Sequence, residues 1–296
     1  MTRRAAATWT ACESTLALLR VGRRAEAEEH LVEFRELVLS HGWRVSINNA
    51  LLVEAAIALA DGRFADGKRL AAEASHHGGR HNAVVALGYG AQILAARMDQ
   101  GRVGEVIASL RGLGGQIRPA WRAMLAGALA DAGDHEQAAA ELDELTAGGS
   151  SGLPHDFTVA LAVRYLPEAC RQLGDVPRAE ALLPVIAPWT GQLLVVTMGT
   201  SIEGASDRSI GHLQATLGRF DEAVAAYAEG ARLERAAGFS SLATRTDYWH
   251  ARALLDRDAN GDRVRARHLL GHVVTIATEL GMGRLAEQAH ALLETP

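Results

Sequence analysis

The sequence predicts an all-α protein, a row of helical hairpins stacked into one solenoid, and three observations lead to this fold class. A glycine expected at the turn between two helices, followed five positions later by a small or apolar residue, recurs at seven places, at intervals of 32 to 44 residues. Apolar residues between these glycines recur at helical spacing. The composition, 48% hydrophobic but only 5% aromatic, suits helices packed closely through small side chains. We therefore expect about seven helix pairs, a capping helix and almost no strand.

The clearest hairpin lies within residues 207–238. Gly218 ends its first helix because glycine takes the left-handed conformation without a Cβ clash, and Ala223 lets the two helices approach closely. A period in this range is typical of tetratricopeptide-like arrays. The other glycines, each with its partner five positions on, are Gly22 with Ala27, Gly62 with Gly67, Gly101 with Val106, Gly133 with Ala138, Gly174 with Ala179, and Gly261 with Ala266.

The seven pairs follow one another along a single domain, residues 1–296. We group them as N-terminal repeats in 1–115, middle repeats with irregular loops in 116–205, and C-terminal repeats with the capping helix in 206–296. The expected helices span 5–21 and 24–41, 43–61 and 64–76, 81–100 and 103–113, 119–132 and 135–147, 156–173 and 176–187, two within 207–238, 240–255 and 262–280, and a last one at 284–293.

Local signals define some helix boundaries and one irregular segment. Pro119 can open the fourth pair because the first-turn N–H of a helix has no partner there. Asp156 is expected to cap the fifth pair with its carboxylate, and Pro167 to kink the first helix of that pair. Residues 188–205 are too apolar for a solvated linker and too rich in glycine for a long helix. We expect them to pack along the concave side or to extend the helix before Asp207.

Charge and cysteine content argue against several classes of protein. A net charge of −5, with Lys and Arg interspersed among Asp and Glu, gives no basic stripe, so we expect no direct nucleic-acid partner. Cys12 and Cys170 lie far apart, which favours small buried thiols in a reducing compartment over a disulfide or a zinc cluster. No apolar run is long enough for a membrane span, and the N-terminal stretch suits an amphipathic helix better than an export signal. We expect a cytoplasmic protein with no membrane partner and no cofactor.

Several motifs after about residue 49 carry a family resemblance. They are Arg118-Pro-Ala-Trp-Arg-Ala, Ala169-Cys-Arg-Gln-Leu-Gly-Asp, the 199–204 loop before Asp207-Arg208, Leu217-Gly-Arg-Phe-Asp-Glu-Ala, Gly261-Asp-Arg-Val-Arg-Ala-Arg-His-Leu-Leu, and Ala277-Thr-Glu-Leu-Gly-Met. The chain resembles the C-terminal tetratricopeptide-like region of actinobacterial LuxR-type regulators and of cyclase-ATPase proteins with a layout like MalT. The resemblance implies a helical sensor or interaction region that, in full-length relatives, follows an ATPase and lies beside a DNA-binding or cyclase module. Since no Gly-x-x-x-x-Gly-Lys-Ser/Thr phosphate loop and no DNA-binding helix-turn-helix motif occur, we expect a free-standing descendant or a fragment.

The candidate ligand site lies on the first helices of pairs four to seven, which line the concave face in such solenoids. Arginine there could hold a carboxylate or phosphate, aromatic rings could stack on an apolar body, and Asp or His could exchange a proton. The competing interpretation, which we favour, is that Asp207 caps a helix, Arg208 pairs with an acid and the aromatic rings fill the core. The candidate residues are Trp121, Arg164, Tyr165, Asp207, Arg208, His212, Tyr248 and His250.

Two other motifs are better explained by structure than by chemistry. Residues 148–152 match a nucleophile-elbow string, but they follow an expected helix rather than a strand, so we expect a loop. His268 and His272 lie four residues apart on one helix but lack a nearby carboxylate or cysteine to complete a metal site. We therefore assign no catalytic residue and no metal ligand.

Two function classes follow from the sequence. The first is a non-enzymatic interaction or regulatory module whose concave groove binds a protein segment or a signal molecule. The second is a small-molecule-binding protein or an enzyme whose groove has become a closed pocket, covered by residues 189–203. The fold alone does not decide between them, because function resides in the site, and the sequence does not predict the oligomeric state.

Overall fold

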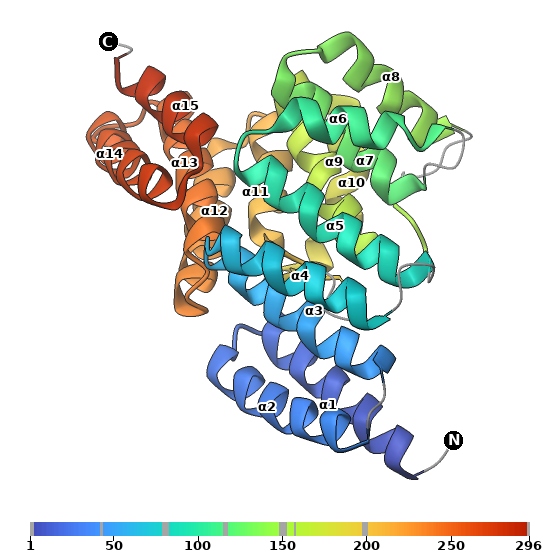
Figure 1. Cartoon of the computed structure of the whole chain (residues 1–296). Coiled ribbons are helices and arrows are strands. Elements are labelled where there is room, and N and C mark those ends of the chain that lie inside the picture. The colour runs from blue at the N-terminus through green and yellow to red at the C-terminus, as the bar shows by residue number, and fades with distance from the viewer. Residues whose placement is uncertain are drawn as a thin grey trace.

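The computed structural model describes residues 3–41, 44–78, 83–114, 118–147, 153–156, 158–196 and 201–294 (Figure 1). These residues form fifteen α-helices, a short 3-10 helix and one two-stranded antiparallel sheet, so the expected all-α class is confirmed. In chain order the elements are α1 (Arg3–Arg20), α2 (Arg24–His41), α3 (Arg44–Ala60), α4 (Phe64–Gly78), α5 (Ala83–Asp99), α6 (Val103–Arg111), α7 (Pro119–Ala132), α8 (His135–Thr146), α9 (Val159–Leu173), α10 (Val176–Ile186), η3 (Ala187–Trp189), β1 (Leu193–Val195), β2 (Ile202–Ala205), α11 (Ser206–Thr216), α12 (Phe220–Ala236), α13 (Ser240–Arg257), α14 (Asp262–Leu280) and α15 (Gly283–Glu294).

The seven glycines singled out in the sequence all lie between two helices and all have positive φ, from 67° to 87°. At Gly133, for example, the left-handed residue ends α7, and its N–H donates to the Ala130 carbonyl oxygen. The seventh turn differs, because the left-handed residue directly after α13 is Asp258, a non-glycine residue with φ of 50°, and Gly261 precedes α14 instead. Positive φ at these positions explains why the glycine spacing located the helix pairs.

The Asp156 cap differs from the structure, and the kink at Pro167 stays a prediction. The first helix of the fifth pair begins at Val159, and Asp156 accepts a hydrogen bond from the Thr158 N–H (2.8 Å) in the turn before it, so its predicted role as the helix cap was wrong. Pro167 lies inside α9, which continues to Leu173. The loop 148–152 lies outside the described residues.

Residues 188–205 do not extend the helix before Asp207, and that alternative was wrong. They contain η3 and the hairpin of β1 and β2, in which Leu193 lies opposite Ala205 and Val195 opposite Ile202. All residues of both strands are buried. The hairpin contacts α1, α3, α9, α12 and α13, and it therefore lies between helices from both halves of the chain.

The C-terminal helices also pack against the turns of the first repeats (Figure 1). The Ser241 hydroxyl donates to the Ala60 carbonyl oxygen (2.9 Å), at the end of α3. Arg24, at the start of α2, binds both carboxylate oxygens of Asp61 and donates to the Ala237 carbonyl oxygen (3.2 Å) after α12. These contacts join helix pairs that are distant in sequence, in addition to the contacts between neighbouring helix pairs.

The consequence of this packing is that the first helices of the later pairs are enclosed on all sides. In α9, every residue from Ala160 to Cys170 is buried, and α7, α11 and α13 are buried over most of their length. The face that the sequence analysis assigned to an open groove therefore lies in the interior at these helices.

Candidate functional site

The structure places seven of the eight candidate residues in the interior and leaves His250 half-buried. Some of them converge, mostly through partners that the sequence analysis did not name. The exposed fractions are Trp121 5%, Arg164 2%, Tyr165 0%, Asp207 3%, Arg208 2%, His212 1% and Tyr248 5%.

Arg164 lies at the centre of the first group, where α5, α9 and β2 meet. Its Nη1 donates to Glu203 Oε2 (2.9 Å), and its Nη2 lies 3.7 Å from Asp99 Oδ1. Its guanidinium also lies over the Tyr165 ring, 4.6 Å from the centroid. Arg245 of α13 donates to the same Asp99 oxygen (2.5 Å), so one aspartate bridges two arginines from different repeats.

Arg208 belongs to a second group, which holds β2 against α11, α12 and α13. Its Nη1 donates to Glu234 Oε1 (3.0 Å) and to the Thr246 hydroxyl (3.1 Å). Glu234 also accepts the Ala205 N–H (2.8 Å) and the Thr246 hydroxyl (2.6 Å). Burial raises the pKa of Glu234, whereas Arg208 and these donors lower it. With three donors on its carboxylate, we treat the pair as ionised.

Close packing around Arg208 depends on a glycine. Gly204 has φ of 100°, and a Cβ at this position would meet the Arg208 guanidinium, whose Nη2 donates to the Glu203 carbonyl oxygen. Any larger residue would strain the backbone and displace the guanidinium. Glu203 thus pairs with Arg164, and the adjacent Gly204 leaves room for the Arg208 guanidinium.

His212 belongs to an aromatic group, in which its Nδ1 and the Tyr227 hydroxyl share a hydrogen bond of 2.9 Å. The Trp249 ring lies edge-on, 4.7 Å from the imidazole centroid. Burial lowers the pKa of His212 well below its ordinary value, and the positive charge of Arg208 adds to this effect. The imidazole is therefore neutral in the folded protein.

The remaining candidates lie apart from these groups. Asp207 accepts hydrogen bonds from the Thr190 hydroxyl (2.6 Å) and the Gly191 N–H (2.8 Å), and so holds the turn after η3. Tyr248 packs edge-on against Trp249 and lies beneath Arg252. Trp121 lines a separate cavity of about 320 Å³ beside α5 and α6. The competing interpretation, that the aromatic rings fill the core, holds for Trp121 and Tyr248. Its expectation that Asp207 caps a helix was wrong, because Asp207 lies inside α11 and that helix has no side-chain cap.

Several buried polar atoms of the interior have no hydrogen-bond partner among the described residues. They include Arg164 Nε and Nη2, Glu203 Oε1 and Arg245 Nε, which belong to residues already joined through ion pairs. Tyr165 Oη and His212 Nε2 are further examples. Buried donors and acceptors of this kind are commonly satisfied by internal water or a bound polar molecule.

Sequence reasoning missed several charged residues of this interior, including Asp99, Glu168, Glu203, Glu234 and Arg245. One of them carried a usable signal, because Glu234 lies seven residues after Tyr227 and three after Ala231, on the apolar side of α12. A carboxylate in such a stripe needs a buried cation. Asp99 is the last residue of α5, where a charged residue is ordinary, and Glu203 lies within a strand of only four residues.

Metal binding receives no support from the part of the chain that the structure describes. No group of three or more His, Cys, Asp or Glu side chains that could hold a metal ion occurs there. His268 and His272 are both exposed. Cys12 and Cys170 are free and buried, and burial raises the pKa of each thiol, to about 11 and about 12.

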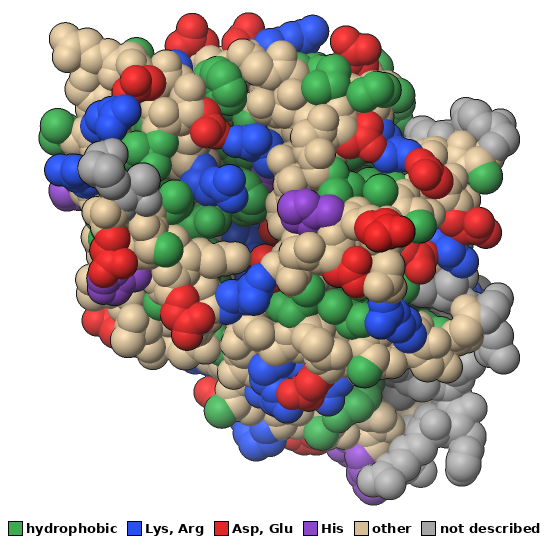
Figure 2. Space-filling model, turned by 90° about the horizontal axis from the view of Figure 1, so that it is seen from above, with side chains coloured by type: hydrophobic (Ala, Val, Ile, Leu, Met, Phe, Trp, Pro, Cys, Tyr) green, Lys and Arg blue, Asp and Glu red, His purple; other side chains and the backbone are tan. Residues whose placement is uncertain are grey.

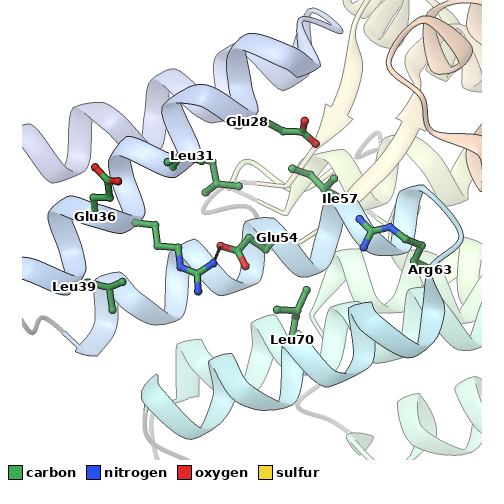
Figure 3. A pocket seen from close by; sticks show the side chains of 10 residues that line it. Glu28, Leu31, Glu36, Leu39, Glu54, Ile57, Arg63 and Leu70 are labelled. Atoms are coloured by element: carbon green, nitrogen blue, oxygen red, sulfur yellow. Dashed lines mark hydrogen bonds and ion pairs between the residues drawn. The ribbon is translucent and has the colours of Figure 1, made fainter.

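An exposed groove of about 510 Å³ lies elsewhere, on the N-terminal repeats (Figure 3). It runs between α2 and α4, and α3 forms its floor with Glu54 and Ile57. Leu31, Val32 and Leu39 of α2 line one side, and Leu70 of α4 lines the other. Val32 and Leu39 are 59% and 56% exposed, which places them among the most exposed large apolar residues described. The sequence analysis did not single out any of these residues.

Surface charge gives no sign of a nucleic-acid site. Acidic and basic side chains are intermixed on the face shown in Figure 2, with hydrophobic side chains between them. None of the described helices has both the length and the apolar character needed to cross a membrane. A scan against protein-family models and a search of curated protein sequences found no match to this chain. The resemblance to LuxR-type and cyclase-ATPase regulators stays a prediction.

Proposed function

We propose that the chain is a non-enzymatic helical-repeat module that binds a segment of another protein in the external groove between α2 and α4. The observation that carries this proposal is the pair of exposed apolar residues, Val32 and Leu39, lying in a groove of about 510 Å³. Exposed apolar surface in a groove with a charged border is typical of interaction sites.

The location differs from the concave groove expected from the sequence. Contacts such as that from Arg24 to Ala237 and from Ser241 to Ala60 bring the chain's own C-terminal helices onto the inner ends of the first repeats. Apart from the half-buried His250, the candidate residues of the later helix pairs are buried, and a protein segment cannot reach them without opening the fold. The groove on α2 and α4 is accessible as it stands.

Two further parts of the proposal rest on the sequence analysis. A role as a sensor or interaction region agrees with the resemblance to the repeat regions of LuxR-type regulators. We also place the protein in the cytoplasm, and the two free, buried cysteines support this because a reducing compartment keeps thiols unpaired.

The test is affinity capture from the source cells with three forms of the protein. Leu39→Glu places a charge in the groove at a position that is already exposed, so the fold should be unaffected. Val264→Glu is the matched control, because Val264 is 74% exposed and lies on α14, away from the groove. A protein retained by the wild type and by Val264→Glu, but lost from Leu39→Glu, supports the proposal. Identical sets of captured proteins for all three forms would refute it.

A second candidate is a protein that binds a small polar molecule in its interior. The observation that favours it is the set of unpartnered atoms on Arg164, Glu203 and Arg245, which are buried and mutually linked. Native mass spectrometry of the purified chain tests this candidate directly. A bound mass that is present in the wild type and absent from Arg164→Met would support it, and an unliganded chain that is stable to heating would argue for internal water alone.

A further inference from the structure

We propose that the segment bound by the α2–α4 groove is a basic amphipathic α-helix of about three turns. This inference rests on the proposed function and adds the conformation, length and charge of the partner.

The walls of the groove favour a helical partner. Two helices flank the groove and a third forms its floor (Figure 3), which is the arrangement that accepts a helix with an apolar face. The backbone groups of these walls are already paired within helices, so an extended segment would find no strand edge to bond with. The lining contains no aromatic residue of the kind that binds proline-rich segments.

The length of the partner follows from the α2 wall. The lining residues of α2 run from Glu28 to Leu39, eleven residues apart, which corresponds to about 16 Å of helix axis, or three turns. Val32 and Leu39 lie seven residues apart on the same side of α2, with Leu31 beside the first. A partner helix with apolar residues at positions i, i+3 or i+4, and i+7 would match this stripe.

The charge of the partner follows from the way the groove arginines are engaged. Arg35 donates to Glu54 across the groove (3.0 Å), and Arg63 lies 2.9 Å from Asp61. Both cations are therefore neutralised by the chain's own carboxylates. Glu36 has no ion pair with any other described residue.

The surroundings of the groove add further negative charge. Helix α2 contains five glutamates, of which Glu26 and Glu28 pair with Arg23 and Arg24, whereas Glu29 and Glu36 have no ion pair with another described residue. A smaller cavity of about 70 Å³ continues the groove, sharing Arg35, Leu39 and Glu54, and ends beside His77 and Glu73, whose carboxylate lies 3.7 Å from Arg69. Among the described residues, Glu36 is thus the acidic residue of the groove lining without a cation, because Glu28 and Glu54 pair with Arg24 and Arg35. An acidic or neutral helix would leave Glu36 uncompensated, whereas lysine or arginine flanking the apolar stripe would complement it.

The experiment is a selection of helix-forming peptides displayed on phage, with the purified chain as bait. Bound phage are released and counter-selected on Leu39→Glu, so that only groove-dependent sequences are retained. Peptides enriched in Lys or Arg around an apolar i, i+3 or i+4, i+7 stripe support the inference. We expect synthetic versions of them to bind Leu39→Glu at least tenfold more weakly than they bind Val264→Glu.

Charge is tested on the same peptides with a matched pair of variants. Glu36→Lys reverses a groove charge, and Glu144→Lys reverses an exposed charge on α8. We expect Glu36→Lys alone to weaken binding, by severalfold at low salt. Groove-dependent peptides that are acidic, or that bind without helix formation by circular dichroism, would overturn the inference while leaving the proposed function intact. A selection without any groove-dependent peptide would overturn both.

Discussion

Removal of the Glu234 carboxylate should show how much the interior ion pair contributes to stability. This carboxylate is fully buried and accepts hydrogen bonds from Arg208, Ala205 and Thr246. Glu234→Ala would leave the Arg208 guanidinium charged and buried, with only neutral acceptors such as the Thr246 hydroxyl and the Leu242 carbonyl oxygen. Breaking a buried ion pair by removing one partner costs about 3 to 5 kcal/mol. We expect a decrease of that size in the free energy of unfolding.

Glu229→Ala is the matched control, because Glu229 lies five residues earlier on the same helix. It also pairs with an arginine, Arg232 (2.6 Å), but both side chains are exposed. Water and salt screen such a pair, and the control should not change stability measurably. The two substitutions therefore remove the same chemical group from one helix and differ in burial.

Urea unfolding followed by far-UV circular dichroism measures both effects. A double variant, Arg208→Met with Glu234→Leu, should recover most of the loss, because apolar residues of similar volume can replace a buried pair without a large cost. A loss for Glu234→Ala as small as that for Glu229→Ala would show that the guanidinium is not held by this carboxylate. The reasoning about the second interior group would then be wrong.

Three further predictions follow from buried groups. Burial lowers the pKa of His212, so in acid the unfolded chain binds a proton that the folded chain does not. Stability should therefore be constant above about pH 6.5 and fall below it. Urea midpoints measured across this pH range should fall less steeply for His212→Gln than for the wild type. Gly204→Ala should lower the free energy of unfolding by about 1 to 3 kcal/mol from backbone strain alone, as measured by urea unfolding. The control Gly90→Ala, on a helix with open space around the glycine, should not destabilise the protein. Cys12 and Cys170 should react with a thiol reagent at mildly alkaline pH only as fast as the protein opens, and immediate labelling of either thiol in the native protein would contradict its burial.

The helix pairs could be predicted from the sequence because their signals are local. Each turn glycine sits where the chain needs a positive φ, and the apolar spacing on both sides sets the helices. The hairpin of β1 and β2 could not be predicted in the same way. Its strands are only three and four residues long and are buried on both faces, so they show no alternation of polar and apolar residues.

The candidate site was predictable only in part. Arg164, Arg208 and His212 were found as titratable residues on inward-facing helices, and they are indeed buried there. Asp99, a partner of Arg164, lies 65 residues before it, and Glu234, the partner of Arg208, lies 26 residues after it. Only the folded chain brings these residues together. The exposed groove was missed because its apolar residues look buried in the sequence. Val32 and Leu39 read as ordinary core positions of an amphipathic helix, and their exposure depends on the separation of α2 from α4.

The contacts between the two ends of the chain also bear on how the protein is made. Ser241 bonds to carbonyl oxygens 181 and 182 residues earlier, so this contact can form only after most of the chain has been synthesised. Closing so long a loop delays folding more than it weakens the final structure. The first repeats must therefore leave the ribosome with the α3 end still uncovered, and they receive their last packing partner when α13 emerges.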